Sequence, residues 1–138
     1  MARMMKGIVV VAGEASGEVL RSREPISFWG GYDHASGEII DRRNPVSGQI
    51  AAGRILGLPF TIGSSTTAAV LLEAVRVGTA PAAILTNRAD SFLALASIVA
   101  EEMYGKPIPI VALGPADFEA LQTGQRLRVR RDGTVEID

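Results

Sequence analysis

The chain has 138 residues and a formal net charge of −1; 47% of its residues are hydrophobic and 21% are charged. This size suits one domain with its own core, and the composition is globular rather than disordered. The near-neutral charge excludes a general attraction to nucleic acid or anionic membranes. The absence of cysteine excludes disulfides, a thiol nucleophile and cysteine-ligated metal clusters on this chain.

The first half of the chain predicts strands and one long connection. Residues 7–12 and 17–23 read as strands, and the apolar run in the first of them is too short for a signal peptide or a membrane span. We therefore expect a cytoplasmic protein without membrane association. Residues 24–44 form a segment rich in glycine and aromatics, in which we expect a packed Trp29 and a short strand at 39–41. Residues 50–58 are predicted as a further strand.

The second half alternates helices and strands. We predict helices at 66–77, 90–104 and 115–121, with Asp90 as the N-cap of the second, and strands at 81–85 and 108–113. The second helix is apolar on most sides and should be heavily buried. Asp132-Gly133 predicts a hairpin between 127–131 and 134–137. The alternation requires parallel strands with helices outside, so the fold class is α/β with additional β structure.

The run Gly63-Ser64-Ser65-Thr66-Thr67 carries the clearest chemical signal. It follows a strand and opens a helix, where free backbone N–H groups and the positive end of the helix dipole favour an anion. Gly63 permits close backbone approach, and the hydroxyl groups can donate, accept or carry a proton. Simple N-capping is the alternative interpretation, since serine and threonine are ordinary caps. The run lacks the lysine of a phosphate-binding Walker loop.

Other chemical groups are less informative. His34 is the only histidine and lies in a predicted exposed turn, so a serine–histidine triad has no other base. The carboxylates show no metal-ligand spacing, and Glu101-Glu102 reads as a solvated face. The arginines at 126–131 are interpreted as the solvent-exposed face of the hairpin, with weak nucleic-acid binding as the minor alternative. The chain thus offers half of an active site rather than a complete one.

Several separate blocks resemble, in order, the small subunit or swivel domain of the aconitase X family. The resemblance covers about residues 7–113 of one domain at 1–138, with the hairpin at 126–138 as an addition. The blocks are EPISFWGGYD (24–33), SGEIID (36–41), GRIL (53–56), GSS (63–65), VLLEA (70–74), GTAPAA (78–83) and IVAEE (98–102).

The resemblance implies a swivelling β/β/α domain of a two-part hydro-lyase that is inactive without its large subunit. That partner, in a heterodimer or higher assembly, is expected to carry an iron–sulfur cluster and most substrate contacts, and this chain is expected to hold no cofactor. Ser64 matches the position of the expected general base, and Gly63, Ser65 and Thr66 are expected to bind the small-molecule substrate. Whether Ser64 or Ser65 is the base stays open at this point.

One position departs from the family pattern. Many relatives have a basic residue directly before the glycine of this turn, whereas this chain has Ile62. Arg54 or an arginine of the partner are the candidates to replace it.

The resemblance leaves three functions open. The favoured one is the small subunit of a cis-3-hydroxy-L-proline dehydratase. The runner-up is the small subunit of (R)-5-phosphomevalonate dehydratase, whose phosphate substrate calls for more basic residues near the site. The third is a non-catalytic swivel domain that binds a small anion or regulates a partner.

Overall fold

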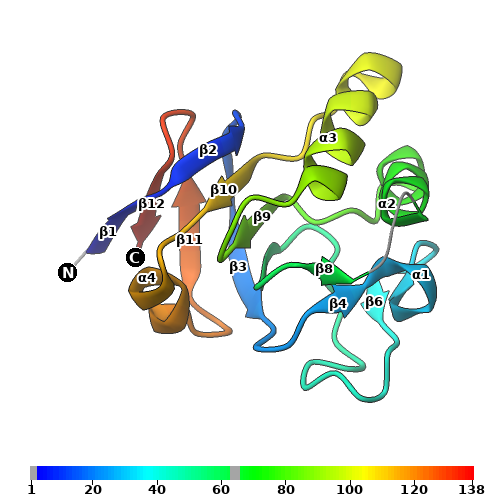
Figure 1. Cartoon of the computed structure of the whole chain (residues 1–138), viewed down its shortest axis with the longest axis horizontal. Coiled ribbons are helices and arrows are strands. Elements are labelled where there is room, and N and C mark those ends of the chain that lie inside the picture. Colours follow the sequence, from blue (N-terminus) through cyan, green and yellow to red (C-terminus); the bar gives the residue numbers. More distant parts are fainter. Residues whose placement is uncertain (1–2, 63–65) are drawn as a thin grey trace.

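The computed structural model describes residues 3–62 and 66–138, and its centre is a curled eight-stranded sheet in the order β1-β12-β11-β3-β7-β9-β10-β2 (Figure 1). Strands β3, β7, β9 and β10 run parallel, and the remaining neighbours pair antiparallel. The strands are β1 (Arg3–Lys6), β2 (Ile8–Val11), β3 (Ala15–Arg21), β7 (Ile55–Leu58), β9 (Ala83–Thr86), β10 (Ile110–Ala112), β11 (Arg126–Val129) and β12 (Thr134–Ile137).

The parallel strands are buried on both faces because helices and the curled hairpin cover them. Helices α2 (Thr66–Val77) and α3 (Ser91–Tyr104) lie side by side on one flank, and α4 (Pro115–Ala120) lies towards β11 and β12 (Figure 1). Successive strand residues enter opposite cores: Leu56 packs with the helices, whereas Ile55 packs with Phe118 of α4 and with the hairpin. This is the side-chain alternation of a strand buried on both sides.

The two outermost strands of the sheet are consecutive in the chain, joined at Gly7. The sheet therefore curls until its ends meet, and the Gly7 N–H donates to the Gly133 carbonyl at 3.0 Å. A Cβ on Gly7 would lie 2.3 Å from Cγ1 of Val111 and 2.8 Å from the Ala112 carbonyl oxygen. Glycine is therefore required at this seam. At the other end of β1, Arg3 is paired with Ile137 of β12.

The segment between β3 and β7 is folded through short elements. These are β4 (Ile26–Ser27), α1 (Phe28–Gly31), β5 (Tyr32–Asp33) and β6 (Glu38–Ile39). Strand β4 pairs in parallel with β8 (Thr61–Ile62), and β5 pairs antiparallel with β6. Phe28 is fully buried, and its ring centre lies 5.1 Å from that of Tyr32, whose hydroxyl donates to the Thr79 carbonyl at 2.7 Å.

The helix ends agree with the predictions. Helix α2 has the predicted bounds and is followed by Gly78 with φ 86°, and α3 is capped by Asp90 and ends before Gly105 with φ 66°. Both glycines occupy the left-handed region that commonly ends helices. No helix within the described ranges is long and apolar enough to cross a membrane.

Three expectations are wrong. The strand predicted over 50–58 occupies Ile55–Leu58 alone, because Gly53 has φ 71° and turns the chain before it. Helix α3 is not buried on most sides: it contacts α2 and β2 on one side, while Ile98 and Met103 are 55% and 61% exposed. Trp29 is not packed but 71% exposed, because Trp29 (ψ 111°) and Gly30 (φ 77°) leave the helical conformation within α1.

Candidate functional site

The candidate catalytic run spans the connection from β8 to α2. Gly63, Ser64 and Ser65 lie outside the described residues, so the geometry of the site comes from the residues on either side. Ile62 ends β8 and is 53% exposed, and Thr66 begins α2 and is exposed. Strands β7 and β9 both end at this edge of the parallel sheet. Ligand sites of parallel sheets commonly lie outside the carboxyl ends of the strands.

The segment that enters the run is held on two sides. On one side β8 pairs with β4, where Ile62 is the partner of Ser27. On the other side the buried carboxylate of Asp90 accepts from Thr61: Oδ2 lies 2.8 Å from the backbone nitrogen and 2.6 Å from Oγ1. Oδ1 of the same carboxylate accepts from the backbone N–H groups of Phe92 and Leu93 in α3.

The first turn of α2 presents one exposed and one buried threonine. Thr66 faces solvent, whereas Thr67 is 1% exposed. Oγ1 of Thr67 has no hydrogen-bond partner among the residues that the structure describes. The positive end of the α2 dipole lies at Thr66, which favours negative charge just ahead of it.

Arg54 lies at the other end of β7. Its guanidinium donates to the Val19 carbonyl at 2.9 Å and to Glu18 Oε1 at 3.1 Å, which ties it to β3. The neighbouring Gly53 N–H bonds the Ala80 carbonyl, which lies beyond the carboxyl end of α2. Helix α2 has twelve residues, so about 18 Å separates its ends. The structure therefore does not bring Arg54 and Thr66 together.

Two other arginines lie beside β8. Arg43 lines a groove with Ile62, Glu24 and Asp41; its side chain is 94% exposed, and its Nε lies 3.5 Å from Asp41 Oδ1. Arg88 follows β9, and its guanidinium carbon stands 4.1 Å from the centre of the Phe60 ring. Arg43 thus shares a groove with Ile62, and Arg88 contacts the residue two before it, whereas Arg54 is bound to β3 at the other end of β7.

The remaining sequence candidates lie on the surface. His34 is exposed in the turn after β5. In the same turn, the Ala35 N–H and the Ser36 hydroxyl lower the pKa of Asp33. Arg126 and Arg128 are exposed on β11, while Leu127 and Val129 between them are buried, as predicted for the wet face of a hairpin.

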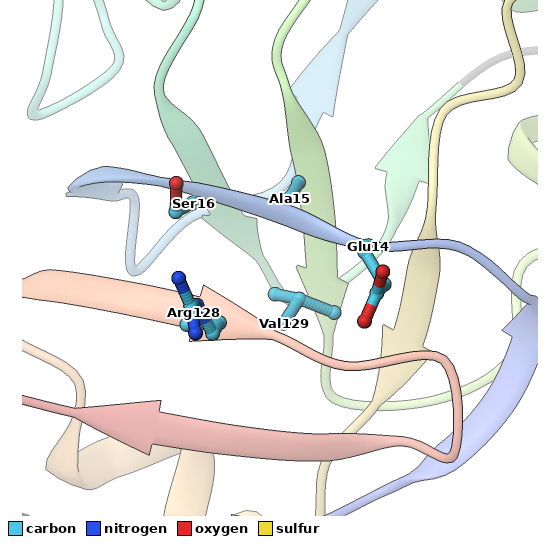
Figure 2. A pocket seen from close by; sticks show the side chains of 5 residues that line it. All are labelled: Glu14, Ala15, Ser16, Arg128 and Val129. Carbon is cyan, nitrogen blue, oxygen red and sulfur yellow. The ribbon is translucent and has the colours of Figure 1, made fainter.

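A separate hollow lies between the start of β3 and the end of β11, lined by Glu14, Ala15, Ser16, Arg128 and Val129 (Figure 2). Arg128 and Ser16 are paired across the two strands. Because β3 runs parallel to β7, its first residues lie at the opposite edge of the sheet from β8. This hollow is therefore not part of the candidate site.

The chain provides no thiolate ligand for an iron–sulfur cluster. It has no cysteine, and its described residues bring together no group of three or more histidine, aspartate or glutamate side chains that could hold a metal ion. An iron–sulfur cluster that worked with this site would need ligands from another chain or domain.

Sequence reasoning missed the contact between Thr61 and Asp90. It identified Asp90 as a helix cap but did not connect it to the candidate catalytic run. The available signal was topological: Thr61 follows β7 and Asp90 follows β9, and these neighbouring parallel strands end at the same edge.

Comparisons with known proteins agree along nearly the whole chain. A family model described as the aconitase X swivel domain matches residues 4–137. The chain is 51% identical to the cis-3-hydroxy-L-proline dehydratase of Pseudomonas aeruginosa over 93% of its own length, but it spans only 22% of that enzyme. It is 36% identical to the phosphomevalonate dehydratase small subunit of Thermococcus onnurineus, with 97% of this chain and 98% of that subunit covered.

A solved structure gives the same result. The crystal structure of Thermococcus kodakaraensis aconitase X in the holo-form matches with a TM-score of 0.88 and 36% identity, over 99% of this chain and 98% of that one. The family match includes the C-terminal hairpin, whose strands lie within the main sheet. The chain therefore belongs to the aconitase X swivel domain family and has its mixed α/β fold.

Proposed function

We propose that this chain is the small subunit of an aconitase X-type hydro-lyase, in which residues 1–138 form one swivel domain and Ser64 is the general base. The observation that carries the proposal is the family match over residues 4–137, which includes the hydroxyl-rich connection between β8 and α2. The relatives reported above are a dehydratase and a dehydratase small subunit. The proposal includes a cytoplasmic location, which is the location expected from the sequence.

The reaction assigned to Ser64 is removal of a proton from carbon. The serine oxygen, as an alkoxide, takes the proton; the C–H electron pair becomes the second bond of an alkene, and the C–O bond breaks to release hydroxide. A serine hydroxyl has a pKa far above neutrality, so its alkoxide needs strong stabilisation. The amino end of α2 supplies N–H groups and a positive dipole for this purpose.

The remaining contacts divide between this chain and its partner. Gly63, Ser65 and Thr66 bind the substrate, and the cation that replaces the family's basic residue is Arg43, Arg88, Arg54 or an arginine of the large subunit. The position of Arg43 in the groove beside Ile62 favours it over Arg54, which is bound to Glu18. An iron–sulfur cluster is expected on the large subunit, with which this chain forms a heterodimer or a higher assembly.

The favoured substrate is cis-3-hydroxy-L-proline. This amino acid is a zwitterion, with one carboxylate and one protonated amine. The groove beside Ile62 carries charges of both signs. Arg43 is complementary to the carboxylate of the substrate, and Glu24 and Asp41 are complementary to its amine. The 51% identity to a hydroxyproline enzyme supports the same choice.

Phosphomevalonate is the second candidate, because the chain covers 98% of a phosphomevalonate dehydratase small subunit. Its carboxylate and phosphate are both anionic, so the two carboxylates of the groove would repel it.

The test combines the chain with the large subunit of its own organism and measures dehydration of both substrates. The Ser64→Ala variant is expected to bind the large subunit normally and to lose at least about 1,000-fold in kcat, the scale of removing a base from a reacting proton. Ser65→Ala is the matched control and should lose less. Near-normal turnover by Ser64→Ala would refute the serine base, and turnover of phosphomevalonate alone would reverse the choice of substrate.

A further inference from the structure

The buried carboxylate of Asp90 does more than cap a helix. An N-cap needs one side-chain oxygen, and serine, threonine or asparagine normally provides it. In this chain Oδ1 fulfils that task, since it lies 3.0 Å from the Phe92 nitrogen and 3.2 Å from the Leu93 nitrogen. The second oxygen is therefore free to serve a different element.

That second oxygen holds Thr61. Oδ2 lies 2.8 Å from the Thr61 nitrogen and 2.6 Å from Thr61 Oγ1, so the carboxylate accepts four hydrogen bonds in all. Asp90 is 8% exposed, and little solvent competes for these bonds. Charge-assisted bonds of this kind are shorter and stronger than neutral ones.

The bridge acts on the segment that leads to the candidate base. Thr61 lies three residues before Ser64, and the opposite side of β8 is fixed by pairing with β4. A further bond from the Asn87 N–H to the Pro59 carbonyl, at 3.2 Å, joins the same two connections. Asp90 is thus the side chain that couples the start of α3 to the entry of the catalytic run.

We propose that Asp90 is a positioning residue for the dehydration: its Oδ2 fixes Thr61, in the segment that leads into the candidate catalytic run, to the start of α3. The inference rests on the proposed function of Ser64. Asparagine or serine at position 90 would retain an acceptor for the helix, but neither side chain offers acceptor oxygens to both α3 and Thr61. The position therefore requires a carboxylate for turnover, although a neutral cap would be enough for the helix.

The test uses the complex with the large subunit and four single variants. Asp90→Ser keeps an N-cap and removes the oxygen that bonds Thr61. Thr61→Val removes the hydroxyl and leaves the cap untouched, so it covers the case in which Asp90→Ser folds poorly. Asp90→Asn removes the charge, and Thr61→Ser keeps the hydroxyl and is the rescue control.

We expect kcat to fall about 100-fold in Asp90→Ser, the effect of a misplacement of about 1 Å. A fall of about 10-fold is expected in Thr61→Val, which keeps the backbone bond, and Thr61→Ser should be close to the parent. KM should change little, because the change affects proton transfer rather than substrate affinity. The double variant Asp90→Ser/Thr61→Val should be no slower than Asp90→Ser, because both substitutions break the same bridge.

Amide hydrogen exchange of the isolated chain gives a readout apart from activity. The Thr61 N–H should be protected in the parent and in Thr61→Ser, and should lose protection in Asp90→Ser while the α3 amides keep theirs. Parental kcat in both Asp90→Ser and Thr61→Val, alongside an inactive Ser64→Ala, would overturn the positioning role and leave the proposed function standing. An active Ser64→Ala would overturn both.

Discussion

At the scale of single residues, Asp132 shows how a turn side chain makes the fold sensitive to pH. Its Oδ1 accepts from the Thr134 N–H at 2.9 Å, and Lys6 on β1 lies 3.4 Å from Oδ2. The bonds from Thr134 are the largest cause, and with Lys6 they lower the pKa of Asp132 from 3.8 to about 2. The carboxylate thereby links the hairpin turn to the first strand.

The lowered pKa of Asp132 determines how the stability of the fold changes with pH. Because the folded-state pKa lies below the unfolded-state value, the charge stabilises the fold fully above about pH 4, and this stabilisation disappears as the pH falls towards 2. Asp132→Asn should therefore be less stable than the parent at pH 7, and the difference should approach zero at pH 2. Urea unfolding of both proteins at both pH values measures this difference in stability. A difference at pH 2 as large as that at pH 7 would contradict the stabilising role of the Asp132 charge.

Residue-scale signals predicted the helix ends and missed the bridge. Gly78, Asp90 and Gly105 act on their own helix, so their meaning can be read from neighbouring residues. The bond between Asp90 and Thr61 depends on which strands are neighbours in the sheet, which local patterns do not encode. The candidate run was therefore proposed from the sequence alone, while the bond between Asp90 and Thr61 beside it became visible only in the fold.

At the scale of elements, α3 explains why a correct helix prediction gave a wrong burial prediction. The helix is apolar around most of its circumference, but the chain provides neighbours for one side only. Leu93 is fully buried, whereas Leu95 is 47% exposed on the same helix. Apolar side chains show that a helix face can be buried, but whether it is buried depends on which elements the fold packs against it.

These two leucines give a matched stability test. Leu93→Ala should lower the free energy of unfolding by about 2–5 kcal/mol, since it removes methyl groups from a closed core. Leu95→Ala should cost about 1 kcal/mol or less, because half of that side chain already contacts water. Chemical denaturation of both variants measures the contrast, and equal losses would mean that α3 is covered on both sides.

Several strands were not predicted from the sequence, among them β1, β4 and β8. Strands β4 and β8 have two residues each, which is too few for an alternating pattern. Their pairing nevertheless places Ser27 beside Ile62, the last described residue before the candidate run. The βαβ part of the sheet was predictable because its strands are longer and its helices impose parallel order.

At the scale of the whole molecule, an exposed tryptophan lies just after β4, the strand that pairs with β8. Trp29 is the only tryptophan and is 71% exposed; it lies two residues after Ser27, the β-sheet partner of the exposed Ile62. Large aromatic side chains in such positions are frequent anchors of protein interfaces. If Ser64 acts on a substrate shared with the large subunit, this edge has to face that partner.

Mixing with the large subunit should therefore bury Trp29. Its fluorescence emission should shift to shorter wavelength, measured as the difference between the parent and Trp29→Phe. Trp29→Ala should weaken the complex by at least about 10-fold, or about 1.4 kcal/mol. Val77→Ala, at the other end of α2 and 44% exposed, is the control and should bind normally. Unchanged emission and affinity would exclude Trp29 from the interface.

The pairing of Arg3 with Ile137 has a consequence for how such domains are connected. Both ends of the described chain emerge from neighbouring antiparallel strands, at one place on the surface (Figure 1). Gene fusion through either end can therefore deliver the domain to the same location on a larger polypeptide without breaking its sheet. One relative matches as 22% of a long enzyme and another as almost a complete subunit, and this geometry accommodates both arrangements.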